Sequence, residues 1–265
     1  MANKSQLLVA VIVISLLLSG CVTHKRHESP FQIGSTVVRA VINQRGNPSP
    51  TFVNVHDDEN TSVIAGMAVL RKSSGRIIEL SHSGRRLVTF TMDGVEFRFD
   101  PNRIFSDEGV RATLSRRGGN YSEAAHRLVK DFANEFITRF KLDDEPAIIA
   151  LHNTGGRGLS INSYSTDGGL NSTSAMIHVG KKRDAGDFFY VTDRRFFDYL
   201  SARDFNVTLQ DNARITDDGS LSVYFARKGI PYMNIEADTA HLTEQTEMIR
   251  VARQMLKDLS LLKNR

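Results

Sequence analysis

The sequence predicts an α/β fold, a mixed and mostly parallel twisted sheet with helices on both faces. After Pro146, short and fully apolar segments alternate with amphipathic ones, beginning with the run from Ala147 to Leu151. Fully apolar strands are typical of a parallel sheet that is covered on both faces. The segment from Leu87 to Phe99 alternates around Asp93-Gly94, a dipeptide that favours a tight hairpin and adds antiparallel strands.

Hydrophobic periodicity and capping residues place the individual elements. They predict strands over 51–55, 147–151, 188–191, 207–209 and 231–235, and helices over 61–72, 122–140, 194–203, 221–228 and 239–262. Asp193 is a candidate N-cap, and Gly229 ends the fourth helix. About 240 residues outside the leader are enough for one domain with a substantial core, expected over 51–265.

The first residues have the pattern of a secretion signal. Lys4 supplies a positive charge, and Leu7 to Leu18 is an apolar stretch too short to span a bilayer comfortably. Leu18-Ser19-Gly20-Cys21 resembles the lipobox of bacterial lipoproteins, which implies a signal peptide over 1–20 and a lipid anchor on Cys21. An ordinary secretory signal with a chance cysteine is the alternative. Residues 21–50 then form a tether, and Val22 favours the periplasmic face of the outer membrane.

Composition limits which residues could bind a metal and which partners are expected. Cys21 is the only cysteine, so any metal must be held by histidine and carboxylate. A formal charge of +4 is too small and too dispersed to indicate a nucleic-acid partner. The runs from Ser73 to Arg86 and from Arg111 to Arg117 are locally basic; they are either solvated loops or surfaces facing an anionic substrate or the envelope.

Ionisable side chains follow three of the expected strands. His56 and Glu59 come after the first, His152 after the second, and Glu236 after the last. His-x-x-Glu alone arises often by chance in a solvated turn. Because functional groups of α/β sheets collect where strands end, we expect these four side chains to meet there. Two histidines and one glutamate match an open zinc site, with the second glutamate beside it.

Asn102 and Arg103 follow the hairpin, and such a pair can recognise a carboxylate. With them, the chain resembles the zinc carboxypeptidases of the carboxypeptidase A superfamily, which order their parts as His-x-x-Glu, Asn-Arg, a distant histidine and a late glutamate. The resemblance covers about 51–250. It implies that His56, Glu59 and His152 bind one zinc ion (Zn2+), that Asn102 and Arg103 hold a substrate carboxylate, and that Glu236 is the general base.

Other roles in that family are less firmly matched. An arginine facing the developing oxyanion corresponds to Arg85 or Arg86, and we take Arg85 as the candidate. The tyrosine that caps bound substrate corresponds to Tyr164, Tyr224 or Tyr232.

The expected function is that of a zinc-dependent metallopeptidase or amidase of the bacterial envelope. It would hydrolyse an amide bond adjacent to a carboxylate-bearing residue, and its location suggests peptidoglycan stem peptides as substrates. One alternative is an N-acyl amino acid deacylase resembling succinylglutamate desuccinylase and aspartoacylase. Another is a non-catalytic metal-binding lipoprotein.

Overall fold

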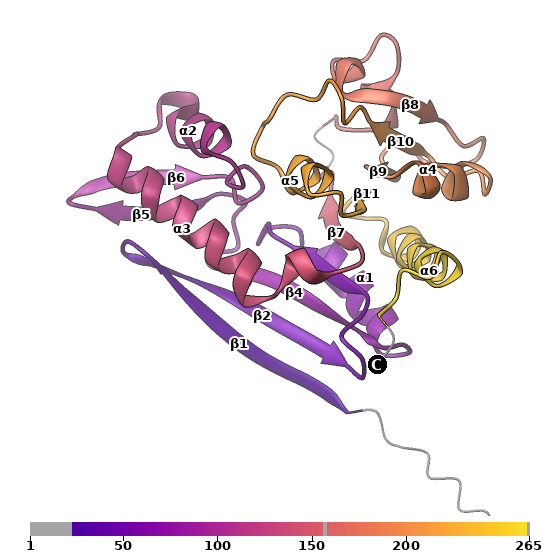
Figure 1. The fold of residues 1–265 in the computed structure, drawn as a ribbon, viewed down its shortest axis with the longest axis horizontal. Helices are drawn as coiled ribbons and strands as arrows, with labels where there is room; N and C mark the ends of the chain where they lie inside the picture. The colour runs from indigo at the N-terminus through magenta and orange to yellow at the C-terminus, as the bar shows by residue number, and fades with distance from the viewer. Residues whose placement is uncertain (1–22, 156–157, 264–265) are drawn as a thin grey trace, which may run out of the picture.

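A nine-stranded mixed sheet forms the centre of the molecule (Figure 1). The computed structural model describes residues 23–155 and 158–263. The sheet order is β1 (His24–Ile33), β2 (Thr36–Arg45), β4 (Gly75–Ser81), β3 (Thr51–Asn54), β7 (Ile148–Asn153), β11 (Tyr232–Ala237), β9 (Phe188–Val191), β10 (Val207–Gln210) and β8 (Ser174–His178). The mixed α/β fold is confirmed, but the sheet is not mostly parallel as expected, because the N-terminal hairpin, β9 and β8 add antiparallel pairs. Four of the eight neighbouring pairs are parallel, and they join β4, β3, β7 and β11, and β9 with β10.

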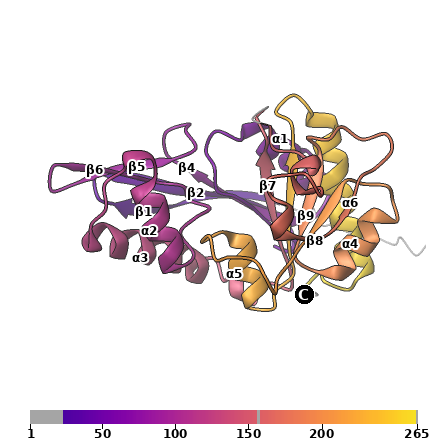
Figure 2. The ribbon, with the colours of Figure 1, turned by 90° about the horizontal axis from the view of Figure 1, so that it is seen from above.

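Helices cover both faces of this sheet, as expected. On one face lie α2 (Asp107–Ser115), α3 (Glu123–Arg139) and α5 (Leu221–Arg227), whose apolar side chains share one core cluster. On the other lie α1 (Asn60–Leu70), α4 (Arg194–Ser201) and α6 (Leu242–Asp258), which share a second cluster. Figure 2 shows α3 and α5 on the opposite side of the sheet from α1 and α6. Short 3-10 turns occupy Arg116–Gly118, Leu142–Asp144, Ile161–Tyr164 and Asn171–Thr173.

The tether expected over 21–50 is replaced, from His24 on, by two strands of the sheet. β1 and β2 form an antiparallel hairpin, and β2 continues the sheet by pairing with β4. Alternate apolar residues give the hairpin one buried face, which includes Phe31, Ile33, Val38, Ala40 and Ile42. The domain therefore begins well before residue 51. The signal peptide and Cys21 lie outside the described residues.

A second hairpin forms a separate two-stranded sheet. It consists of β5 (Val88–Met92) and β6 (Val95–Phe99), as the sequence predicts, with Asp93 and Gly94 at φ values of 52° and 77° in the turn. Its Val88 pairs with Phe99 at the base, so the residues just before β5 and just after β6 lie close together. In the described part of the chain, no helix is long and apolar enough to cross a membrane.

Candidate metal centre

Three adjacent central strands bring the predicted residues together at their carboxyl ends. β3, β7 and β11 are parallel neighbours, and His56 follows the end of β3. His152 on β7 and Glu236 on β11 are directly paired in register. Glu59 returns toward His56 because its backbone amide donates to the His56 carbonyl at 3.2 Å, which forms a tight turn before α1.

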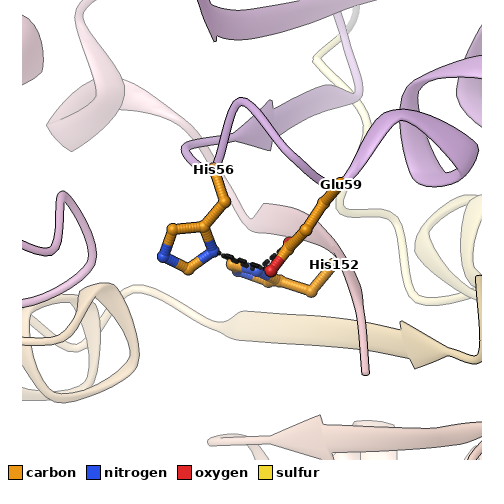
Figure 3. Close-up of side chains that lie close together, drawn as sticks. All are labelled: His56, Glu59 and His152. Carbon is orange, nitrogen blue, oxygen red and sulfur yellow. Dashed lines mark hydrogen bonds and ion pairs between the residues drawn. The ribbon is translucent and has the colours of Figure 1, made fainter. Parts of the chain in front are cut away.

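His56, Glu59 and His152 form a compact, buried cluster (Figure 3). The two Nδ1 atoms of the histidines are 3.1 Å apart. One Glu59 oxygen lies 3.0 Å from the His56 Nδ1, and the other lies 2.7 Å from the His152 Nδ1. At most 5% of each side chain is exposed. Three donor groups therefore point at one small volume that water hardly reaches.

This donor set fits a divalent metal ion. Zinc binds histidine nitrogen at about 2.0–2.1 Å in tetrahedral sites, which places two such ligands roughly 3.3 Å apart. The observed Nδ1 separation of 3.1 Å is close to that value. Two ring nitrogens in contact also need a proton or a cation between them, since neither lone pair can face the other alone. The His152 Nε2, buried with no hydrogen-bond partner among the described residues, is left to carry the ring proton.

Asp100 fixes the orientation of His56, a candidate metal ligand. The His56 Nε2 lies 2.8 Å from Asp100 Oδ1, which also accepts a hydrogen bond from the backbone N–H of Asn102 at 2.8 Å. A carboxylate on one ring nitrogen fixes the tautomer and directs the other toward the metal. Sequence pattern alone does not identify Asp100, because its contact with His56 depends on where the hairpin folds.

The cluster is strongly polarised. Burial by itself would lower the pKa of His56, but the charges and hydrogen bonds of Glu59 and Asp100 outweigh it and raise that pKa to about 9. The opposite holds for the two carboxyls. Burial would raise the pKa of each, yet the facing histidines hold both pKa values well below their usual range. The site therefore favours concentrated positive charge between its carboxylates.

Comparisons with known proteins give only distant likenesses. No family model and no curated protein matches the chain. Among solved structures, a candidate metallopeptidase from Shewanella baltica is 13% identical with a TM-score of 0.41, covering 90% of this chain and 87% of its own. An aspartoacylase family protein from Mesorhizobium loti is 14% identical with a TM-score of 0.41, covering 92% of this chain and 73% of its own. Likeness at this level does not extend to activity or substrate.

Arg86, rather than Arg85, reaches the buried cluster of His56, Glu59 and His152. Its Nη1 donates to Glu59 at 2.7 Å, and its Nε lies 3.3 Å from Asp100. Arg86 also lines the cavity beside the cluster. Arg85 is exposed and lines a separate surface pocket. The two arginines are adjacent, so only the direction of each side chain distinguishes them.

A cavity of about 220 Å³ opens beside the cluster and contains most of the remaining candidates. Glu236 lies in its wall, where burial raises the pKa of the carboxyl and the Glu59 charge adds to the effect. The Asn234 amide donates to Glu236 at 2.9 Å. Of the candidate tyrosines, Tyr164 and Tyr232 line the cavity, whereas Tyr224 bonds to Asp143 elsewhere.

Asn102 and Arg103 also line this cavity, but both have internal partners. The Asn102 Oδ1 accepts from the Leu221 amide at 3.0 Å, which leaves its side-chain NH2 group to donate. The Arg103 Nε lies 3.5 Å from an Asp218 oxygen, and both side chains are partly exposed. A substrate carboxylate would therefore have to replace or share this ion pair.

His241 is not part of the centre. It lies 2.9 Å from Asp187, in a second group of possible metal ligands that includes the exposed Asp184. That group is outside the cavity next to His56, and we assign it no role.

Proposed function

We propose that the protein is a metal-dependent hydrolase, with zinc as its metal, that cleaves an amide bond adjacent to a carboxylate-bearing residue. The observation that carries the proposal is the pairing of Glu236 with His152. It puts a buried carboxyl with a raised pKa next to the candidate ligands and in the same cavity as two arginines.

Each group has a distinct task in this reaction. When bound, the metal would polarise the scissile carbonyl and activate water. Glu236 takes the proton from the attacking water and passes it to the leaving amine. The Arg86 guanidinium donates to the oxygen on which negative charge develops. Arg103 and the Asn102 amide orient the substrate through its carboxylate.

Hydrolysis with and without chelator tests the proposal. The purified, zinc-loaded protein is incubated with muropeptides, with unmodified peptides and with N-acetyl and N-succinyl amino acids. We expect cleavage that chelator abolishes and zinc restores. Faster turnover of the acyl amino acids would favour the deacylase, an outcome that the small cavity allows. If no compound is cleaved, the hydrolase proposal is wrong.

Glu236→Gln separates catalysis from simple metal binding. Its side chain keeps the same shape but cannot accept the proton, so metal content should be unchanged while turnover falls at least about 100-fold. An unchanged turnover number would favour the non-catalytic alternative.

We further propose that the chain is anchored in the envelope through Cys21 and meets peptidoglycan stem peptides there. The support is the lipobox-like sequence at 18–21. Fractionation of expressing cells should find the wild type in the outer membrane and Cys21→Ser in the soluble periplasm. Equal distributions would exclude the anchor.

A further inference from the structure

A basic groove lies between the last turn of α1 and the C-terminal half of α6. It encloses about 250 Å³, and its lining contains four cations and no carboxylate. The cations are Lys72, Arg250, Arg253 and Lys257, and the apolar part of the wall is made by Ala68, Val69 and Leu262. The groove shares no residue with the metal pocket.

The cations of the groove have no acidic partner. Within residues 23–155 and 158–263, none of the four forms an ion pair. Arg253 is half-buried and donates instead to the carbonyl and the hydroxyl of Ser74. Burial lowers the pKa of Arg253, and no carboxylate opposes that shift. A guanidinium that is partly removed from water without a counter-ion favours an anion from outside the chain.

The carboxylates near the groove on α6 have other partners. Glu247 pairs with Arg183 at 3.3 Å, and Asp258 accepts from the Tyr199 hydroxyl at 2.7 Å. Even if Asp258 is counted against the adjacent Lys257, three cations remain unmatched. The groove therefore carries a positive surplus.

The groove and the candidate metal centre lie at opposite ends of α1. This helix begins at Asn60, directly after the candidate ligand Glu59, and ends at Leu70, between the groove residues Val69 and Lys72. Its 11 residues separate the two ends by about 16 Å. A surface that binds the groove would therefore leave the metal pocket on the far side of the protein.

The first described strand starts at the groove end of the molecule. His24 pairs with Arg45, which pairs with Gly75 on the next strand, so His24 lies about 10 Å from the residue that follows Ser74. Cys21 precedes His24 by three residues, a length of chain that spans at most about 11 Å. A lipid on Cys21 would therefore hold this end of the protein close to a membrane.

We propose that the groove binds the phosphates of anionic phospholipids and docks the protein on a membrane with its metal pocket turned away from the bilayer. Lysine and arginine side chains are attracted to an anionic leaflet, and a polybasic patch adds to the hold of a lipid anchor. The inference goes beyond the proposed hydrolysis and extends the proposed anchoring, because this attraction does not require the lipid on Cys21.

Vesicle flotation of the Cys21→Ser chain tests the proposal without the anchor. The protein is mixed with neutral phosphatidylcholine vesicles and with vesicles that contain about one-third phosphatidylglycerol. We expect clearly stronger binding to the anionic vesicles, and this difference should shrink as salt is raised. The neutral vesicles report any binding through the apolar N-terminal stretch.

Two charge-matched variants in this background locate the contact. Lys72→Gln/Arg250→Gln removes two exposed cations of the groove and should weaken binding to anionic vesicles about 30-fold. Lys181→Gln/Lys182→Gln removes two exposed cations outside it and should weaken binding by less than about threefold. All four side chains are exposed, so both variants should remain folded, which circular dichroism checks.

Equal binding to the two kinds of vesicle would overturn the inference. So would equal losses in the two variants, since net charge alone would then attract the protein. Binding of polyglutamate without binding of anionic vesicles would also reject it, because the partner would be an acidic polypeptide. The other proposals have separate readouts: fractionation of the wild type tests the anchor, and chelator-sensitive cleavage tests the hydrolase.

Discussion

At the scale of single residues, hydrogen bonds to residues outside the cluster of His56, Glu59 and His152 decide which of its atoms face one another. Asp100 accepts from the His56 Nε2, so the Nδ1 atom is the one directed at Glu59 and His152. Gln245 donates to the His152 carbonyl at 2.7 Å and holds that strand residue from behind. The geometry of the candidate ligands therefore depends on residues outside the cluster.

The adjacent arginines allow a direct test of the oxyanion role. Arg86→Gln should lower kcat about 100- to 1,000-fold, the effect of removing one donor to a developing oxyanion. Arg85→Gln should leave kcat within about twofold, because Arg85 lines a different surface pocket. Steady-state kinetics on both variants, with metal content measured alongside, makes the comparison. Equal losses, or a loss confined to Arg85→Gln, would show that Arg86 does not have this role.

The pH dependence of metal binding follows from the raised pKa of His56. That pKa is about 9 in the folded chain, above the usual 6.5, so the protonated ring stabilises the metal-free fold below pH 6.5 and this contribution is lost as the pH rises through 9. A metal ion must displace the proton. Calorimetry in buffers of different ionisation enthalpy should detect release of about one His56 proton per ion at pH 7, and apparent affinity should rise with pH. An affinity that does not change between pH 6.5 and 8.5 would contradict this.

The sequence predicted the clustering of His56, Glu59 and His152 better than the contacts around them. The proximity of His56, His152 and Glu236 could be predicted because each follows or ends an apolar strand, and the carboxyl ends of parallel strands lie on the same side of a sheet. Our choice of Arg85 did not match the contacts in the structure, where Arg86 reaches the cluster, because neighbouring side chains differ only in direction. Asp100 was missed because its contact with His56 spans 44 residues of sequence.

At the scale of elements, α6 holds the carboxyl end of β7, which carries the candidate ligand His152, through hydrogen bonds. Gln245 on α6 is fully buried, donates to the His152 carbonyl and accepts from the Asn153 amide at 3.0 Å. Asn153 in turn accepts from the Ser62 amide at the start of α1. One polar network thus joins α1, β7 and α6 directly behind the candidate metal ligands.

Gln245→Leu should therefore destabilise the protein. The substitution removes the side-chain donor to the buried His152 carbonyl and one of the two acceptors of the Asn153 amide, which also donates to the Ala237 carbonyl, at a cost of about 1–3 kcal/mol in the free energy of unfolding. Gln254→Leu is the control on the same helix, because the side chain of Gln254, as far as the structure describes the chain, bonds only to the exposed Asp258. Urea unfolding measures both. A cost for Gln245→Leu no greater than for Gln254→Leu would mean that the network adds no stability.

Long, regular elements were predicted more closely than short ones. The helix behind Asp193 begins where its predicted cap indicates, and the helix expected over 122–140 begins one residue later, with Ser122 as its N-cap; each cap accepts a backbone hydrogen bond. The strands β4 and β8 and the helix α2 were not anticipated. β4 lies within a basic run where its buried Ile77 and Ile78 are flanked by charged residues, so sequence pattern alone favoured a loop.

At the scale of the whole molecule, the N-terminal hairpin belongs to the core. Phe31 on β1 packs against Phe132 of α3 with ring centroids 5.1 Å apart, and it is 3% exposed. A flexible tether would bury no such residue. The polar composition around it concealed the strand, because β1 has only one buried end and is otherwise exposed.

Phe31→Ala distinguishes a core strand from a tether. Removing the ring should cost about 3–5 kcal/mol of unfolding free energy through lost burial and a cavity. Gln32→Ala, at the exposed neighbouring position, should change stability by less than about 0.5 kcal/mol. Thermal or urea unfolding compares them. Equal stability of Phe31→Ala and the wild type would place this segment outside the folded core.

The metal content of the purified protein tests the central claim most directly. After purification without chelators, elemental analysis should find about one zinc ion per wild-type chain, little metal in His152→Gln, and a full complement in His241→Gln, whose histidine belongs to the separate Asp187 group. Circular dichroism confirms that the variants remain folded. A folded wild type that neither retains nor takes up zinc, or a His152→Gln variant that holds as much metal as the wild type, would contradict the account.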